Sequence, residues 1–470
     1  MRAVAATIAL VLATTACSSG DSVGEDTGSL APIGAPGDLV TSEGFALPDP
    51  PVVPTGPTTS ALIADLDDLF QLLDSGLLLS EHVVALADHD DLRVGWVLAD
   101  LTRFMTTVEA AVAVADAFEL LTGVDLTARD GGASIWKSIN DHMIGWDVPA
   151  FDEYPAYKER LFARFEPGWA QFFADSESLI DWRFVTWGGV FIDDRELGAE
   201  HVCSRGCIPA LDDPVVTPAD GGDWYPDDAI VFGLVVDGEA RAYPKNIMEV
   251  HEMINDTLGG RRIGMPYCTL CGSAQAYFTD MVPDDVETPI LRTSGLLSRS
   301  NKIMYDLVTG SVFDTFTGVA LSGPLREAGI VLDQTTVVTS TWEAWKESHP
   351  DTTIVAEDGG IGRSYDLDPL RGRDDDGPIF PVGDVDSRLA VQEPVIGVIA
   401  PDGTPIAFPA VTARVALENG DSVRALGVTL SVDGDGLRAY AADGDEIAAH
   451  QAFWFAWSQF HPDTELWVTG

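Results

Sequence analysis

The sequence predicts an α+β protein, in which an N-terminal helical domain is followed by a β-rich core of two related modules. Three observations support this prediction. Apolar residues recur at helical spacing between residues 59 and 190. From residue 191 the pattern changes to short β-like runs, which are separated by glycine and proline turns. Within that β-rich part, one series of short motifs occurs twice in the same order.

The N-terminus is typical of an exported protein. Met1-Arg2 is a short basic start, and Ala3–Ala13 is an apolar run of signal-peptide length that is too short to span a bilayer. Small residues lead into Cys17 as at a bacterial lipoprotein cleavage site, although Thr14 stands where leucine is usual. We therefore expect residues 1–17 to be a signal peptide ending at a lipidated Cys17, which anchors an extracytoplasmic protein to the cell membrane. The alternative is a plain secretory signal with a cysteine there by chance.

The chain is strongly acidic. It has 75 acidic and 27 basic residues, which gives a net charge of −48. Such a surface repels nucleic acid and anionic lipid headgroups, so we expect no nucleic-acid partner. A solvated acidic face adapted to salt explains this composition better than a specific cation store does. The hydrophobic content of 46% is sufficient for proper cores.

Two regions precede the β-rich part. Residues 18–58 are rich in glycine, proline, serine and acidic residues, and this composition predicts a disordered tether that cannot bury enough apolar surface to order itself. Residues 59–190 predict a helical domain, with further amphipathic stretches that begin near Ser80, Val108 and Tyr154. The first helix has one leucine face, formed by Leu62, Leu66, Leu69 and Leu73.

The β-rich part is expected to consist of one module over residues 191–355 and a second, degenerate module over residues 356–470. In the first module, Ala229–Val236 predicts a strand that returns through an Asp-Gly hairpin turn. The next segment, Asn246–Asn255, predicts a short helix that ends in a turn.

Two signatures suggest that the modules arose by duplication. A Gly…Asp-Gly…Ala-aromatic-Pro series runs from Gly233 to Pro244 and again from Gly397 to Pro409. A W-x-x-W run followed by His-Pro-Asp-Thr extends from Trp342 to Thr352 and again from Trp454 to Thr464. The two repeated histidines are expected at helix ends rather than as ligands. The second module has no cysteine and no counterpart of His251, so we expect the chemistry in the first module.

The most informative stretch is the turn Tyr267-Cys268-Thr269-Leu270-Cys271-Gly272, between the predicted strands Arg261–Tyr267 and Ala274–Phe278. Two thiols three positions apart can share a metal ion or close a small reducible disulfide. Gly272 can adopt positive φ, which lets the backbone fold around the sulfurs. Besides Cys17, the remaining cysteines are Cys203 and Cys207. Four cysteines outside the cell allow two disulfides or one four-thiolate site.

Several other motifs accompany this turn in one combination. They are Ala240–Pro244, His251–Asp256, Ser294-Gly295, Asn301, Met304–Asp306 and Thr341-Trp342. Over about residues 200–470 the combination resembles the bacterial family named domain of unknown function 3179, whose usual turn reads C-P-L-C-G; here Thr269 replaces the proline. The family name assigns no activity, so the resemblance implies an architecture and a site. Some members are described as carrying selenocysteine in the cysteine motif, which favours redox chemistry.

The interpretation that we favour from the sequence is a soft-metal site. Cys268 and Cys271 supply two thiolates, and His251, on the preceding helix, is expected to converge with them. Cys203 and Cys207 could complete a four-sulfur site. Sulfur with imidazole suits copper(I), zinc or iron, so the expected cofactor is one of these metals and the expected partner is a metal-transfer protein.

The second interpretation is thiol–disulfide redox chemistry at the same cysteine pair. His251 would help to form the attacking thiolate, and a redox protein would be the partner. A strand rather than a helix is expected after Cys271, which removes the helix-dipole activation of thioredoxin-like sites. The third interpretation is a structural or binding lipoprotein with two inert disulfides, Cys203–Cys207 and Cys268–Cys271.

Four polar residues are expected around the site. The Glu252 carboxylate could hydrogen-bond the His251 imidazole and so orient it. Arg292, Ser294 and Asp306 could line a pocket. The sequence contains no phosphate loop, dinucleotide fingerprint, nucleophile elbow or metalloprotease helix. Hydrolase and nucleotide-dependent functions are therefore disfavoured.

Overall fold

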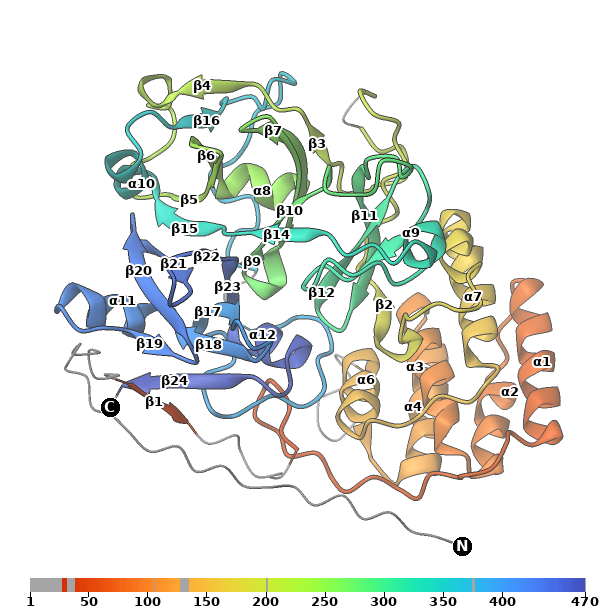
Figure 1. Cartoon of the computed structure of the whole chain (residues 1–470). Coiled ribbons are helices and arrows are strands. Elements are labelled where there is room, and N and C mark those ends of the chain that lie inside the picture. The colour runs from red at the N-terminus through yellow and green to blue at the C-terminus, as the bar shows by residue number, and fades with distance from the viewer. Residues whose placement is uncertain are drawn as a thin grey trace, which may run out of the picture.

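The computed structural model describes residues 28–31, 39–105, 107–126, 135–199, 202–373 and 377–469. The predicted signal peptide and Cys17 lie outside these ranges, so the lipid anchor stays a prediction. None of the helices in the described ranges is long and apolar enough to cross a membrane. Figure 1 shows a helical region on one side of the molecule and a β-rich region on the other, which confirms the α+β class.

The helical region buries aromatic and leucine side chains from helices packed against one another. Leu62, Leu66 and Leu69 are buried as the leucine face predicts, together with Trp96 and Phe118. Its helices are α1 (Ser60–Asp74), α2 (Ser80–Ala85), α3 (Gly95–Phe104), α4 (Val108–Thr122), α6 (Ile135–Gly145) and α7 (Tyr154–Phe165). Short 3₁₀ turns are η1 (Leu86–His89), η2 (Leu92–Val94), η3 (Pro167–Phe173) and η4 (Trp182–Phe184).

The core of the helical region continues into a neighbouring sheet. This sheet has the strand order β13-β12-β11-β2, with β2 at Val185–Trp187, β11 at Leu291–Ser298, β12 at Asn301–Asp306 and β13 at Val312–Phe313. Leu296, Ile303 and Tyr305 of this sheet belong to the same apolar cluster as the helices. The helical region and the first module are therefore packed together.

The first module is built on the sheet β15-β5-β6-β16-β4. Strands β5 (Ile230–Val236) and β6 (Glu239–Pro244) form the expected hairpin, with positive φ at both turn residues Asp237 and Gly238. Strand β15 (Val338–Thr341) pairs antiparallel with β5, helix α10 (Trp342–Ser348) follows, and β16 (Thr353–Val355) pairs parallel with β6. The edge strand is β4 (Val216–Pro218), which pairs with β16.

The second module repeats this connectivity in the sheet β1-β24-β18-β17-β23. Strands β17 (Pro394–Ile399) and β18 (Pro405–Pro409) form the hairpin. Strand β23 (Ala449–Phe453) pairs antiparallel with β17, helix α12 (Trp454–Phe460) follows, and β24 (Glu465–Thr469) pairs parallel with β18. The two modules thus share strand order and strand direction.

The repeated motifs have equivalent packing roles in the two modules. The Trp345 indole donates to Thr352 Oγ1 at 2.9 Å, and the Trp457 indole donates to Thr464 Oγ1 at 2.8 Å. Each tryptophan also contacts the histidine at the end of its helix, with ring centroids 4.0 and 4.1 Å apart. A Cβ on Gly397 would lie 2.1 Å from the Trp457 ring, which explains the repeated strand glycine. The repeated signatures therefore maintain the core of each module.

Each module carries a second sheet. In the first module its order is β14-β10-β8-β7-β3, with β9 paired to β8. In the second its order is β19-β20-β21-β22. The strands of these sheets are β3 (Leu211–Asp212), β7 (Met253–Leu258), β8 (Arg261–Cys268), β9 (Ser273–Ala274), β10 (Ala276–Phe278), β14 (Asp333–Thr335), β19 (Arg424–Ala425), β20 (Val428–Asp433), β21 (Gly436–Tyr440) and β22 (Glu446–Ile447). The remaining elements of the β-rich region are η5 (Ala219–Gly221), α8 (Lys245–His251), η6 (Thr269–Cys271), α9 (Gly323–Glu327) and α11 (Ala410–Glu418).

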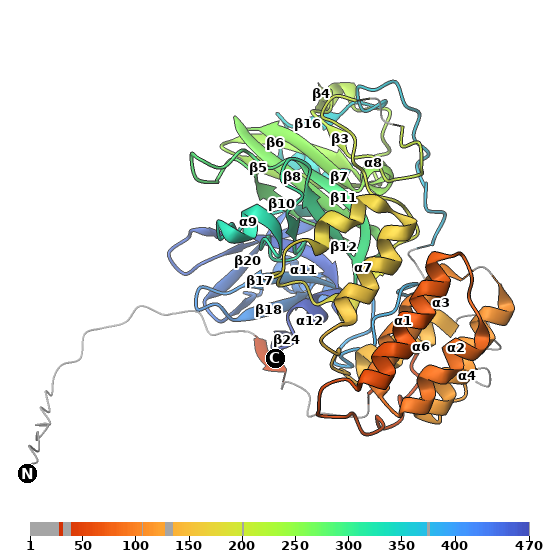
Figure 2. The same cartoon turned by 90° about the vertical axis from the view of Figure 1, so that its right-hand side faces the viewer.

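The segment between the modules runs along the boundary with the helical region (Figure 2). The backbone N–H groups of Val382 and Gly383 donate to the Asp141 carboxylate of α6, and the Phe380 ring packs edge-on against Trp136.

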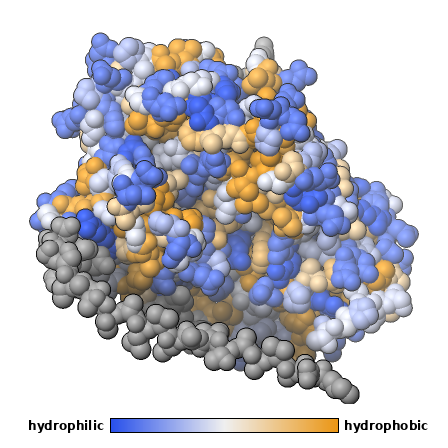
Figure 3. Space-filling view, in the orientation of Figure 1, coloured by the Kyte–Doolittle hydropathy of each residue, from blue (hydrophilic) through white to orange (hydrophobic). Residues whose placement is uncertain are grey.

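Hydrophilic residues cover much of the face seen in Figure 1, with apolar residues scattered between them (Figure 3). The face in this view is therefore largely hydrophilic.

The tether predicted for residues 18–58 is not disordered throughout. Strand β1 (Gly28–Ala31) pairs antiparallel with β24, and Leu47 is buried. The polar composition does not prevent this pairing, because β24 is otherwise an edge strand with free backbone groups, which an extended chain of almost any composition can pair with.

The helix predicted over Asn246–Asn255 is also shorter than expected. Helix α8 ends at His251, Glu252 adopts the left-handed conformation with φ of 51°, and residues 253–258 form strand β7. Strand β7 lies between β8 and β3 and is almost wholly buried, so sheet packing overrides the local helical pattern.

Candidate functional site

The cysteine turn joins two strands of the first module. Strand β8 ends at Cys268, the turn η6 contains Cys271, and β9 follows directly. Gly272 has a φ of +56°, and a Cβ there would lie 2.9 Å from the Phe453 ring of the second module. The turn therefore needs glycine both for its backbone conformation and for its close contact with the other module. Both thiols are buried and free.

The surroundings of Cys268 are polar and come from distant parts of the chain. The Cys268 thiol lies 3.6 Å from the Ser300 carbonyl oxygen, and the Lys302 backbone N–H donates to the sulfur. The Lys302 ammonium on β12 forms an ion pair of 2.7 Å with the Glu252 carboxylate and donates to the Glu252 carbonyl oxygen at 2.6 Å. A buried lysine and a glutamate therefore stand beside the thiol.

The pKa values of the two thiols are shifted in opposite directions. Burial raises the pKa of Cys268, but the hydrogen bond from Cys271 and the charge and backbone N–H of Lys302 outweigh burial, so its pKa lies below the ordinary value. The charge of Glu252 acts in the opposite direction. Burial, followed by the hydrogen bond and charge of Cys268, raises the pKa of Cys271 well above the ordinary value. Cys268 is thus the more acidic thiol of the pair and Cys271 the less acidic one.

Cys268 opens onto a cavity of about 210 Å³, whereas Cys271 is not among the residues that line it. Both cysteines belong to an apolar cluster with side chains of the second module, but only Cys268 also reaches the cavity. The cavity wall carries the charged side chains of Glu249, Glu252, Lys302 and Arg373. The apolar part of the wall is formed by Val190, Ile208, Leu270, Leu296, Leu297, Ile303, Leu370, Ile379 and Phe380. One sulfur is therefore accessible from a cavity and its partner is not.

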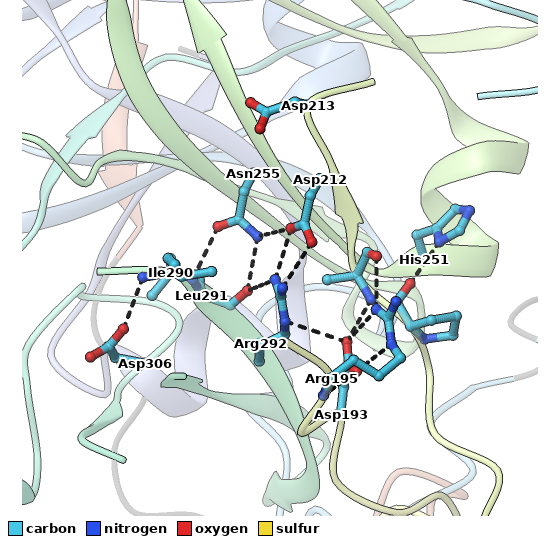
Figure 4. Close-up of polar contacts among 12 residues, drawn as sticks. Asp193, Arg195, Asp212, Asp213, His251, Asn255, Ile290, Leu291, Arg292 and Asp306 are labelled. Carbon is cyan, nitrogen blue, oxygen red and sulfur yellow. Dashed lines mark hydrogen bonds and ion pairs between the residues drawn. The ribbon is translucent and has the colours of Figure 1, made fainter. Parts of the chain in front are cut away.

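His251 does not converge with the two thiols, which corrects the prediction. Its Nδ1 lies 2.6 Å from the Pro209 carbonyl oxygen, and its Nε2 lies 2.7 Å from the Tyr365 hydroxyl. Figure 4 shows the position of His251. Among the described residues, no group of three candidate ligand atoms within 4.8 Å of one another includes this imidazole or either thiol of the turn. The left-handed turn at Glu252 is the reason, because it directs Glu252 toward the cysteine turn, where its carbonyl oxygen accepts from the Tyr267 N–H.

Cys203 and Cys207 form their own disulfide and do not join the turn. Their sulfurs lie within 4.8 Å of a carboxylate oxygen of Asp193. That carboxylate already accepts hydrogen bonds from the Arg195 side chain and the Ala210 backbone N–H. The four-sulfur site is therefore wrong. Of the two inert disulfides in the third interpretation, the one between Cys268 and Cys271 is also wrong, because both residues are free thiols.

Arg292, Ser294 and Asp306 stabilise the fold rather than line the cavity (Figure 4 shows Arg292 and Asp306). Both terminal nitrogens of Arg292 donate to Asp212 at 2.8 Å. The Ser294 hydroxyl donates to the Ile303 carbonyl oxygen at 2.6 Å, and the Asp306 carboxylate accepts from a backbone N–H at 2.8 Å. The predicted pocket exists, but the neighbours of Ser294 line it.

Lys302 is a candidate site residue that the sequence alone did not single out. It directly follows Asn301, one of the motif residues, and is one of only five lysines in the chain. It also stands in the middle of a β-like run, where a lysine is unusual unless it is paired. These two signals together could have marked it.

Comparison with known proteins locates the site within one family. Residues 205–428 match the family model described as "Protein of unknown function (DUF3179)". This part of the chain is therefore similar to the DUF3179 family, as its motifs predict. The match contains the cysteine turn, Glu252, Lys302 and the hairpin of the second module, and ends before α12. No curated protein and no solved structure matches the chain.

Proposed function

We propose that this protein is a thiol redox protein, in which Cys268 attacks an oxidised substrate and Cys271 resolves the intermediate. One observation carries the proposal. The thiol that opens onto the cavity is the one whose pKa is lowered, and it accepts a hydrogen bond from a second free thiol whose pKa is raised. A reactive thiolate backed by a protonated partner is the arrangement that dithiol chemistry requires.

The reaction follows from the positions of the two sulfurs. The Cys268 thiolate attacks the substrate from the cavity and forms a transient bond to it. Cys271 then attacks Cys268, which closes a disulfide within the turn and releases the reduced product. Two electrons pass to the substrate, and a small external thiol or dithiol returns them to the pair through the same cavity. That reductant is the proposed partner.

Lys302 replaces the activation that a helix N-terminus supplies in other C-x-x-C sites. Only the three-residue 3₁₀ turn η6 begins directly after Cys268, and strand β9 follows it, so this turn does not supply the dipole of a full helix. The ammonium and the backbone N–H of Lys302 supply positive charge and a hydrogen-bond donor in its place. The buried position strengthens both effects, because the charge is poorly screened there.

Metal binding is the second candidate, because two free thiols stand next to each other. Structural zinc and iron–sulfur sites usually need four ligands, whereas the described residues place only these two thiols at the turn. Copper(I) accepts soft thiolate ligands and is the metal that fits this donor set.

The test is a thiol and metal assay on the wild-type protein and on the Cys268→Ser and Cys271→Ser variants, purified without oxygen or chelator. We expect two free thiols of which only Cys268 reacts in the native protein, no stoichiometric metal, and an alkylation rate of Cys268 that rises at a pH below about 8.5, the ordinary thiol pKa. Cys271→Ser should move that rise to higher pH, because it removes the hydrogen-bond donor.

The Cys203→Ser/Cys207→Ser double variant is the matched control and should leave the alkylation profile unchanged. One equivalent of copper that protects both thiols from alkylation would support metal binding instead. Thiols that do not react in the native protein would refute both candidates.

A further inference from the structure

The position of Cys268 restricts what can reach it. The residue is only 3% exposed, and its access is through the 210 Å³ cavity. This volume is smaller than the roughly 300–1,000 Å³ of pockets that bind drug-sized ligands. A disulfide on a folded protein cannot enter such a space and align its S–S bond with the Cys268 sulfur. The oxidised substrate must therefore be a small molecule.

The lining restricts the polarity of that molecule. Aliphatic side chains such as Ile208, Leu296 and Ile303, together with the ring of Phe380, make up half of the residues that line the cavity. A charged substrate would lose its hydration there and would find carboxylates as well as cations on the wall. A neutral molecule with a compact alkyl group fits this lining best.

Lys302 indicates which bond is broken. Its ammonium has two acceptors in Glu252, and its third N–H has no protein acceptor among the residues that the structure describes. Lys302 also lines the cavity beside Cys268. A proton donor at this position serves a strongly basic leaving group such as an alkoxide far more than it serves a thiolate, which leaves without protonation.

We propose that the substrate is a small organic hydroperoxide, which the cavity admits by size and polarity and which Cys268 reduces to an alcohol with Lys302 as the proton donor. This inference rests on the proposed dithiol function and specifies its substrate class.

The step balances with the residues present. The Cys268 thiolate attacks the terminal oxygen of the hydroperoxide, an S–O bond forms, and the O–O bond breaks. The departing alkoxide takes a proton from the Lys302 ammonium and leaves as the alcohol. Cys271 then attacks the sulfenic acid at Cys268, an S–S bond forms, the S–O bond breaks, and the hydroxyl leaves as water with the Cys271 proton. An external dithiol reduces the disulfide, and Lys302 regains its proton from water.

The experiment follows loss of thiols in the full-length protein with four oxidants. They are tert-butyl hydroperoxide, hydrogen peroxide, hydroxyethyl disulfide and insulin as a protein disulfide. We expect tert-butyl hydroperoxide to react at least tenfold faster than with free cysteine thiolate, and insulin not to react. In Cys271→Ser, the sulfenic acid should persist and be trapped by dimedone.

Two variants test the parts played by Lys302 and the cavity. Lys302→Met should slow the hydroperoxide reaction at least tenfold even at a pH where Cys268 is fully ionised, which separates proton donation from an effect on the thiol pKa. Lys346→Met, at a solvent-accessible lysine paired with Asp227, is the control and should be unaffected. Ile379→Trp, at a half-exposed position on the cavity wall, should slow tert-butyl hydroperoxide more than hydrogen peroxide.

The outcomes separate this inference from the function on which it rests. If hydroxyethyl disulfide oxidises the pair while hydroperoxides react no faster than with free cysteine, the substrate class is wrong and the dithiol function stands. If insulin is reduced as fast as the small oxidants, the cavity does not select by size. If no oxidant forms the Cys268–Cys271 disulfide, the proposed function fails as well.

Discussion

His450 provides a quantitative test of how the two modules are joined. Its ring lies where they meet, with Nδ1 3.0 Å from the Gln334 amide nitrogen and Nε2 3.4 Å from that of Gln275. The ring is buried beside Phe316 and Trp457. Burial, together with the nearby charge of His461, lowers the pKa of His450 to about 3. The histidine is therefore neutral in the folded protein at every pH above that value.

The sign and size of the effect follow from proton linkage. In the unfolded chain the histidine has its ordinary pKa of about 6.5, so acid protonates the unfolded state first. The contribution of neutral His450 to stability is complete above pH 6.5 and is lost as the pH falls toward 3. The slope is about 1.4 kcal/mol per pH unit, which gives a loss of about 2 kcal/mol between pH 7.5 and pH 5. Any folded-state pKa below about 4 gives the same loss over this interval.

The assay is urea unfolding of the wild-type protein and the His450→Gln variant at about pH 7.5, 6.5, 5.5 and 5. Glutamine cannot titrate but keeps a donor and an acceptor for the two neighbouring amides. Carboxylates titrate in both proteins and cancel in the comparison. We expect the variant to lose about 2 kcal/mol less than the wild type between pH 7.5 and pH 5. Equal losses in the two proteins would refute the reasoning, because His450 would then be accessible to protons in the folded state.

Two further predictions concern the site and the repeat. Lys302→Met should raise the pKa of Cys268 and Glu252→Gln should lower it, because the lysine charge favours the thiolate and the glutamate charge opposes it; alkylation rates as a function of pH measure both, and shifts in the same direction would contradict the electrostatic account. Gly397→Ala should lower the free energy of unfolding by at least about 2 kcal/mol, because the new Cβ overlaps a tryptophan ring in a strand that cannot move. Gly56→Ala, which meets no atom within 4 Å, should change it by less than about 0.5 kcal/mol, and similar effects of the two substitutions would show that the module core is loosely packed.

Much of the architecture was predictable because it depends on short-range patterns. The leucine spacing from Leu62 onward marks a helix face, and Asp237-Gly238 marks a hairpin turn. The α+β class and the family resemblance are both confirmed. The C-x-x-C-G turn is recognisable for the same reason, since both thiols and the glycine lie within five residues and need no distant partner to be seen together.

By itself the sequence determined where the cysteine pair stands and which elements surround it. Only the tertiary structure decided which residues act on that pair. Lys302 reaches Cys268 from a strand more than thirty residues further along the chain, and its burial depends on how β12 packs against the turn. His251 and Glu252 are adjacent in sequence, yet only Glu252 comes to the site. The left-handed backbone at Glu252 makes that choice, and the packing of α8 and β7 sets this conformation, because a non-glycine residue has no local preference for it.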